Sequence, residues 1–225
     1  MSLTRHTFQV LKKDIRLEWR TRARLNALVF FALSTLLLFS FALGPDTRLL
    51  QKNAGGYLWL TLLISSTLSL GESFRIEAEN DALEGLRLIP VDGRAIFLGK
   101  ALGNALTLMM LGLAILPPAI ALFDVHFVLG FPRLALVLAL GSLAISAPGT
   151  VYSAISSFAR ARDVLLPLML FPLLIPALLA ASKASALIFQ GDPMNQYGSW
   201  ISLLAGFNLI YWGLGFTLFP YVIEG

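Results

Sequence analysis

The segment Phe74–Pro90 reads FRIEAENDALEGLRLIP and stands between two long apolar stretches of the chain. Five of the thirteen acidic residues gather here: Glu77, Glu79, Asp81 and Glu84, with Glu72 just upstream. Its charges alternate with a small apolar set, and a proline ends it, so we expect a short amphipathic helix. Because charged side chains are rare within membrane spans, the segment must lie in water between two of them. There it can contact another protein, or it can be a solvated surface helix that contacts nothing.

The composition of the whole chain indicates a membrane protein. Of its 225 residues 57% are hydrophobic and 13% are charged, and the mean hydropathy is +0.77. A soluble domain carries about 25% charged residues, so this chain has too few to cover a water-facing surface. The apolar runs are long and do not alternate, which favours spanning helices over a β-barrel. The absence of cysteine excludes disulfides and thiolate metal ligands.

Six spans account for the apolar runs, all within one transmembrane domain over residues 1–225. They are expected at about 26–43, 57–70, 96–123, 134–158, 164–188 and 200–222. Gly44-Pro45 ends the first span, and Gly55-Gly56 is read as part of the following loop. Three prolines in the fifth span predict either a bent helix or an ordinary span, since prolines are common in such segments.

The leader at residues 4–24 is basic and amphipathic. Its apolar residues recur every three or four positions, at Phe8, Leu11, Ile15 and Trp19. This spacing predicts a helix at the lipid headgroup surface, with these four side chains as interfacial anchors. The alternative is a positive leader that only fixes orientation. No apolar run occurs in the first 25 residues, so we expect the first span itself to act as the insertion signal.

Lysine and arginine are distributed unequally between the two sides of the membrane. With Lys100 and Lys183 counted with the nearest loops, thirteen fall in the leader and in the loops after the second and fourth spans, and four fall in the other three loops. The positive side of a membrane protein faces the cytoplasm, so we expect both termini and Phe74–Pro90 there. The net charge of +4 is explained by this topology, and no nucleic-acid partner is expected.

Catalytic and metal-binding patterns are weak. The run Gly93–Lys100, GRAIFLGK, fails as a phosphate-binding loop, because the glycine spacing is wrong and Ala101 replaces the required Ser or Thr. If ATP drives this protein, another chain must bind it. All thirteen acids can be placed outside the spans, which disfavours a proton-coupled carrier. His126 is either a metal or haem ligand or, more simply, an exposed loop histidine.

Small residues favour close helix approach at two places. Gly99 and Gly103 have GxxxG spacing at the start of the third span, and small residues crowd the fourth span between Gly141 and Ala154. Such residues let helices approach within one protomer or between two copies.

Several motifs together resemble the haem exporter protein B family, the CcmB-type permease component of the cytochrome c maturation ABC transporter. The motifs are Phe74-Arg75, Leu83-Glu84, Leu86, Leu88, Pro90, Gly44-Pro45, Pro148-Gly149 and the proline-rich run 167–176. The likeness covers nearly the whole chain. The chain departs from the family pattern at Asn80-Asp81, where the family commonly has Asp-Gly.

The resemblance implies an all-α, ABC-2-type (type V exporter-like) permease of the bacterial inner membrane, with segment 74–90 as its coupling helix. Glu77, Glu79, Asp81 and Glu84 would meet basic residues of an ABC ATPase, while Leu83 and Leu86 fill apolar pockets. It also implies a haem-handling membrane protein, a small single-span subunit and a second copy of this chain as partners. ATP and Mg²⁺ would bind the ATPase, and haem would be the substrate, carried by this chain or released from its chaperone.

Three functional hypotheses follow. The first is a non-catalytic permease subunit that depends on a partner ATPase. The alternative is a stand-alone secondary transporter of a small hydrophobic substrate, driven by an ion gradient. An intramembrane enzyme is disfavoured, because the expected spans lack a recognisable group of nucleophile, base and metal ligands.

Overall fold

The computed structural model describes residues 3–20, 22–44, 46–74, 92–157, 159 and 162–224, without the side chains of 17–20, 22–24, 162, 163 and 224. All regular secondary structure in these residues is α-helical. The helices are α1 (Leu3–Arg20), α2 (Arg22–Leu43), α3 (Thr47–Ser73), α6 (Gly93–Phe123), α7 (Phe131–Ser157), α8 (Arg162–Gln190) and α9 (Tyr197–Glu224).

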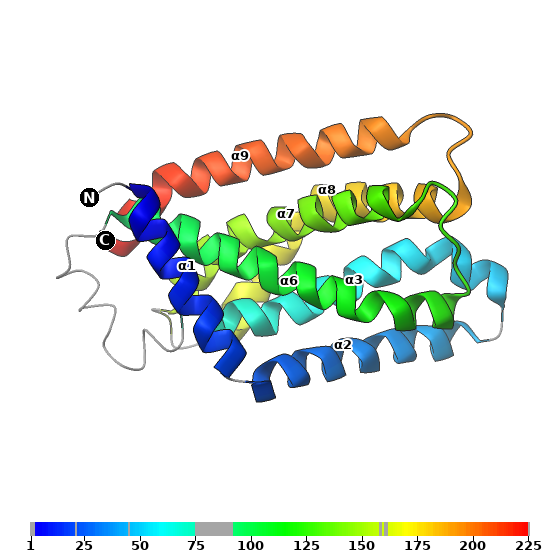
Figure 1. Ribbon diagram of the computed structural model, residues 1–225, viewed down its shortest axis with the longest axis horizontal. Helices are drawn as coiled ribbons and strands as arrows, with labels where there is room; N and C mark the ends of the chain where they lie inside the picture. The colour runs from blue at the N-terminus through cyan, green and yellow to red at the C-terminus, as the bar shows by residue number, and fades with distance from the viewer. Residues whose placement is uncertain are drawn as a thin grey trace.

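Six of the helices, α2 to α9, run lengthwise beside one another, while α1 lies obliquely across one end of the bundle (Figure 1). Both chain termini lie at that end, together with the end of α3 and the start of α6. We call it the terminal end, and we call the opposite end, with the α2–α3, α6–α7 and α8–α9 connections, the far end.

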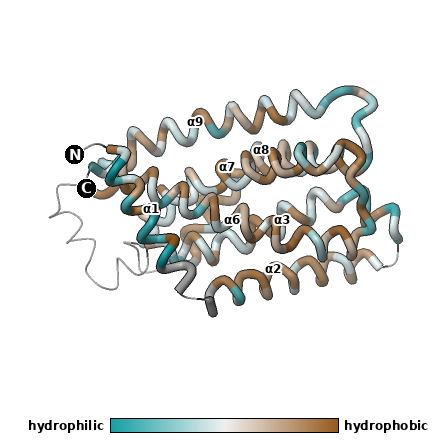
Figure 2. Tube along the Cα trace, in the orientation of Figure 1, coloured by the Kyte–Doolittle hydropathy of each residue, from teal (hydrophilic) through white to brown (hydrophobic). Residues whose placement is uncertain are grey.

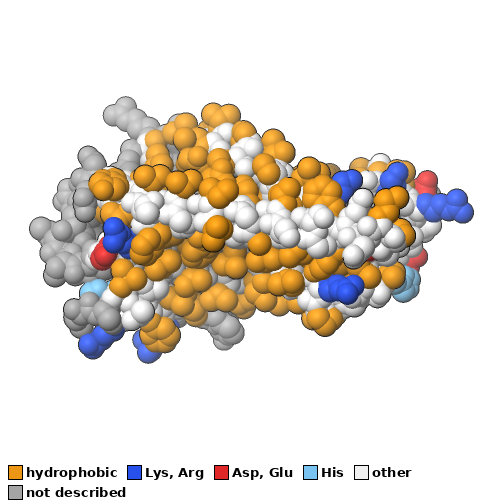
Figure 3. Space-filling view, turned by 90° about the horizontal axis from the view of Figure 1, so that it is seen from above, with side chains coloured by type: hydrophobic (Ala, Val, Ile, Leu, Met, Phe, Trp, Pro, Cys, Tyr) orange, Lys and Arg blue, Asp and Glu red, His pale blue; other side chains and the backbone are white. Residues whose placement is uncertain are grey.

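The bundle has the surface of a membrane protein. Each of the helices α2, α3, α6, α7, α8 and α9 is long and apolar enough to cross a bilayer. Hydrophilic residues concentrate in α1 and at the two ends (Figure 2), and on the face seen in Figure 3 apolar side chains cover the middle, with charged side chains toward the ends. Within the candidate spans, large apolar side chains such as Phe30 and Leu209 are exposed. The expected all-α fold with six spans is therefore confirmed.

The core is built by close contacts onto α7, whose candidate span is the most buried of the six. The Trp59 ring of α3 lies directly over Gly141, where a Cβ atom would be 2.0 Å from the ring. The same indole donates a hydrogen bond to Ser185 Oγ of α8 at 3.0 Å. The small residues of the fourth span thus serve packing within the protomer.

The second span shows the main difference from the sequence-based boundaries. Helix α3 begins at Thr47, where the expected span begins at about residue 57, because Asp46 caps its first turn by accepting hydrogen bonds from the backbone N–H groups of Arg48 and Leu49. The glycine pair read as a loop lies inside this helix. A Cβ on Gly55 would be 2.7 Å from the backbone oxygen of Ser182, so glycine allows α3 and α8 to touch. The three prolines of the fifth span lie within α8, which continues as one helix.

Candidate functional site

A buried lysine lies at the terminal end. Lys100 is about two turns inside α6, and only 2% of its surface is exposed. Its Nζ donates a hydrogen bond to the backbone oxygen of Ser73, the last residue of α3, at 2.6 Å. The same ammonium lies 3.5 Å from Asp14 Oδ2 of α1 and 4.5 Å from the centre of the Phe74 ring. One cation therefore joins three helical elements.

Asn104 extends this contact to α7. It lies one turn further along α6 and donates hydrogen bonds to Ser73 Oγ at 3.3 Å and to Thr150 Oγ1 at 2.9 Å. Since buried amide and ammonium groups are costly to leave without partners, these bonds strongly favour one arrangement of the helices. We refer to Asp14, Ser73, Phe74, Lys100, Asn104 and Thr150 as the junction.

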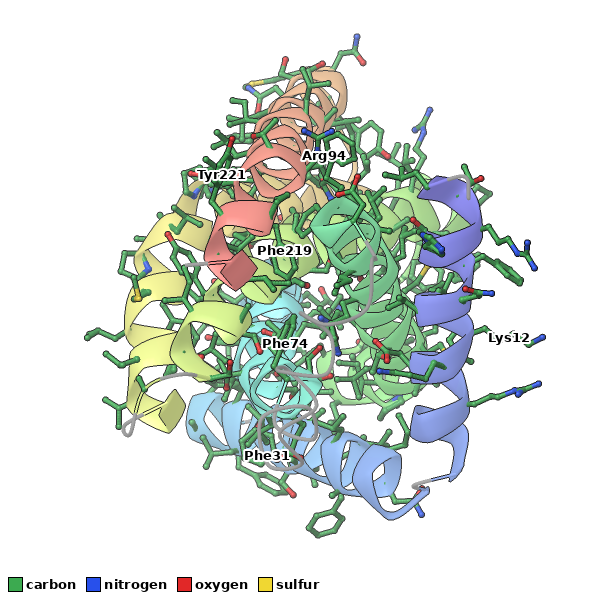
Figure 4. The ribbon with its side chains drawn as sticks, turned by 90° about the vertical axis from the view of Figure 1, so that its left-hand side faces the viewer. Lys12, Phe31, Phe74, Arg94, Phe219 and Tyr221 are labelled. Atoms are coloured by element: carbon green, nitrogen blue, oxygen red, sulfur yellow. The ribbon has the colours of Figure 1, made fainter. Side chains whose placement is uncertain are left out.

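Aromatic side chains pack beside the junction in a small apolar cluster separate from the main core. The Phe74 ring lies 6.0 Å from that of Phe219, and Phe97 lies 5.5 Å from Phe219 and 5.8 Å from Trp212. Phe74 and Phe219 are seen in the middle of the ring of helices when the terminal end faces the viewer (Figure 4). The last described residue before position 75 is thus held in the interior.

The chain re-enters the described structure at Asp92, which caps α6 by accepting a hydrogen bond from the Arg94 backbone N–H at 2.9 Å. A Cβ on Gly93 would lie 2.9 Å from Pro220 Cα of α9, so the helix start is in close contact with α9. The Arg94 guanidinium lies 5.3 Å from the centre of the Phe216 ring. Both flanks of segment 75–91 are therefore packed against the bundle.

The first helix packs on α6 through the GxxxG pair. A Cβ on Gly99 would lie 2.7 Å from Val10 Cβ and 3.0 Å from the Thr7 backbone oxygen, and one on Gly103 would lie 3.7 Å from Leu11 Cδ1. The close approach expected of this motif occurs here within the protomer, between α1 and α6.

This packing leaves the proposed anchors of the leader exposed to different extents. Phe8 is exposed, whereas Leu11 and Ile15 are half-buried. The Trp19 side chain lies outside the described residues. The basic face of α1 is turned outward, as Lys12 shows by pointing away from the bundle (Figure 4).

The other proposed site residues are not brought to the junction. Glu77, Glu79, Asp81, Leu83, Glu84 and Leu86 lie outside the described residues. His126 is exposed at the far end, and in the part of the chain that the structure describes no three metal-binding side chains gather.

The sequence alone does not predict the junction, because Lys100 is counted with the nearest loop and Asp14 lies within the basic leader 4–24. A usable signal was present. Lys100 and Asn104 are four residues apart in an otherwise apolar run, which places both on one face of a helix. Polar residues on a shared face of a spanning helix predict buried partners.

Comparison with known proteins identifies the family of this chain. The family model of the CcmB protein matches residues 5–221. The heme exporter protein B of Pseudomonas aeruginosa is 33% identical, with 95% of this chain and 92% of that protein aligned. The proteins of the same name from Haemophilus influenzae and Escherichia coli K12 are each 30% identical, over 87% and 88% of this chain and 87% and 90% of their own lengths. The chain is therefore a multi-pass membrane protein that belongs to the CcmB family.

Proposed function

We propose that this chain is the membrane subunit of an ABC transporter for cytochrome c maturation. In this proposal it couples ATP hydrolysis by a partner ATPase to haem export or to release of a haem-loaded chaperone. It has no catalytic role of its own, and ATP and Mg²⁺ bind the partner. The names of its relatives, heme exporter protein B, support haem as the substrate.

The observation that carries the coupling role is the anchoring of the two flanks of segment 75–91. Phe74 and Ser73 contact α6 and α9 on one side, and Gly93 contacts α9 on the other. A force applied to the segment would therefore reach buried residues of several spans. The end of α3 next to the segment is held by the buried Lys100, and a buried cation is costly to separate from its partners.

The docking surface in this proposal is the acidic and apolar face of the segment. Glu77, Glu79, Asp81 and Glu84 meet basic residues of the ATPase, and Leu83 and Leu86 enter apolar pockets. This requires both termini and the segment to be cytoplasmic, as the lysine and arginine distribution predicts. The other proposed partners are a haem-handling membrane protein, a small single-span subunit and a second copy of this chain in the bacterial inner membrane.

Co-purification tests the docking. The double variant Leu83→Asp/Glu84→Lys is expressed with the ATPase subunit of the same transporter, beside a far-end control, Val128→Asp/Met194→Lys, whose positions are both exposed. We expect the docking variant to lose co-purified ATPase roughly tenfold or more, as for residues at the centre of an interface, and the control to keep it. Equal recovery from both variants would contradict the docking surface.

Cytochrome yield tests the function itself. In bacteria that lack their own heme exporter protein B, the wild-type chain should restore c-type cytochromes, measured by haem staining, and the docking variant should not. A stand-alone secondary transporter would instead move its substrate with the purified chain alone, driven by an ion gradient. Haem accumulation in vesicles with no nucleotide hydrolase present would overturn the proposal.

A further inference from the structure

At the junction, the Lys100 side chain connects α1 to the C-terminal end of α3. The ammonium of Lys100 lies between the carboxylate of Asp14 on α1 and the backbone oxygen of Ser73, which ends α3. The elements that meet here are far apart in sequence, and α1 is the only described helix outside the six candidate spans. The N-terminal helix is thereby tied to the transmembrane body at the point where the described part of α3 ends.

Because Lys100 is buried, its contacts with Asp14 and Ser73 are costly to break. A buried ion pair contributes little compared with an apolar contact of the same volume, but removing one partner leaves an uncompensated charge. Separation of α1 from α3 would leave the lysine, 2% exposed, with fewer partners in a low-dielectric site. The two helices therefore favour moving together over moving apart.

The steric fit between α1 and α6 acts in the same direction. Val10 and the Thr7 backbone oxygen contact Gly99, one residue before Lys100, so the lysine and the helix contact occupy the same turn of α6. Within this contact Asp14 brings a carboxylate to the buried ammonium, while Lys12 on the same helix points away from the bundle. The packing fixes where α1 lies, and the charge pair fixes its register along α6.

We propose that Lys100 is a positioning residue for coupling, which makes α1 move with the ends of α3 and α6 during the ATP cycle. This inference rests on the proposed function, because it takes ATP hydrolysis by a partner as the source of movement. The competing explanation is that Lys100 only stabilises the fold. A stabilising residue would change the amount of folded protein, whereas a coupling residue changes the movement of α1 in folded complexes.

Distance measurement between spin labels separates these two roles. The natural chain has no cysteine, so Lys12→Cys on α1 and Met194→Cys in the α8–α9 connection at the far end introduce the two labelling sites of the chain. Both positions are exposed, and Lys12 points away from the bundle (Figure 4). The complex with the ATPase is reconstituted into nanodiscs, and double electron–electron resonance is recorded without nucleotide and after trapping with ATP and vanadate.

We expect trapping to shift the label distance in the otherwise wild-type complex. Lys100→Met, which keeps the length of the side chain without the charge, should lower the shifted population about tenfold, a usual size for coupling between linked sites. Lys100→Arg should restore the shift at least in part, because it keeps the positive charge.

Asp14→Asn gives a second route to the same answer. It removes the carboxylate on α1 and keeps the bond from Lys100 to Ser73, so it should also lower the shifted population. If Lys100→Met gives no monodisperse protein, Asp14→Asn decides the question. A full shift in either folded variant, or no shift in the wild type, would overturn the inference. Failure of the wild-type chain to bind an ATPase would instead overturn the proposed function.

Discussion

The two ends of the bundle are held together in different ways. At the terminal end the polar contacts of the junction are buried or half-buried, since Lys100 and Asn104 bond to α1, α3 and α7. At the far end they are exposed. Gln51 donates a hydrogen bond to the Asp124 backbone oxygen at 2.7 Å, and Gln190 donates one to that of Lys52 at 3.2 Å.

This difference affects what each end can do. Water replaces an exposed hydrogen bond at little cost, so the far-end contacts close loops without fixing the helices firmly. A buried contact resists opening because its partners lose solvation. The terminal end is therefore suited to transmitting displacement between helices. The far end is suited only to closing the loops that connect the helices.

Truncating an aromatic side chain should give the largest difference between the two ends in the free energy of unfolding that is lost. Phe74→Ala removes a ring that is 1% exposed, and we expect the free energy of unfolding to fall by about 3 kcal/mol. The far-end counterpart is Phe131→Ala, whose ring is 47% exposed and contacts Phe127 at its edge. We expect a loss of about 1 kcal/mol or less there. Unfolding of the purified protein in mixed detergent–SDS micelles measures both values.

Comparable losses at the two positions would contradict this ranking. They would mean that detergent or lipid covers Phe131 as fully as protein covers Phe74. In that case the terminal end is not the more strongly packed of the two, and coupling through this end loses its structural basis.

The spans were predictable from sequence because hydropathy acts locally. Runs of apolar residues fix the number of spanning helices, and all six expected spans correspond to helices of the structure. The start of α3 was not predictable in this way, since the Gly55-Gly56 pair is typical of a loop and is helical here because Gly55 contacts α8. Such a contact between distant segments leaves no local pattern.

The candidate site was predictable only in part, for the same reason. The proposed docking residues come from the resemblance and remain predictions. The junction depends on Asp14 meeting Lys100, and no spacing rule connects positions so distant in the chain. The GxxxG pair at Gly99 and Gly103 indicated a close contact, but its partner, α1, followed only from the three-dimensional arrangement.

Truncating an amide side chain should also destabilise the protein more at the terminal end than at the far end, but by a smaller margin. Asn104→Ala removes the hydrogen bonds to Thr150 Oγ1 and Ser73 Oγ, and we expect the free energy of unfolding to fall by about 2 kcal/mol. Gln51→Ala removes an exposed bond and should change the stability by less than about 0.5 kcal/mol. The same micelle unfolding assay applies. A larger loss from the Gln51 variant than from the Asn104 variant would reverse the proposed order of the two ends.

Removing a helix cap should lower the stability by the same amount at either end. Asp46 at the far end and Asp92 at the terminal end each accept hydrogen bonds from the first turn of a helix, and both are exposed. Each change to Ala should cost about 1 kcal/mol, because the lost interaction is of the same kind and equally hydrated. Equal losses in the unfolding assay would leave burial as the source of the contrast between the ends. If Asp92→Ala proved several times more costly than Asp46→Ala, the terminal end would owe its rigidity to the start of α6, and Lys100 would lose its role as the residue that ties the helices together.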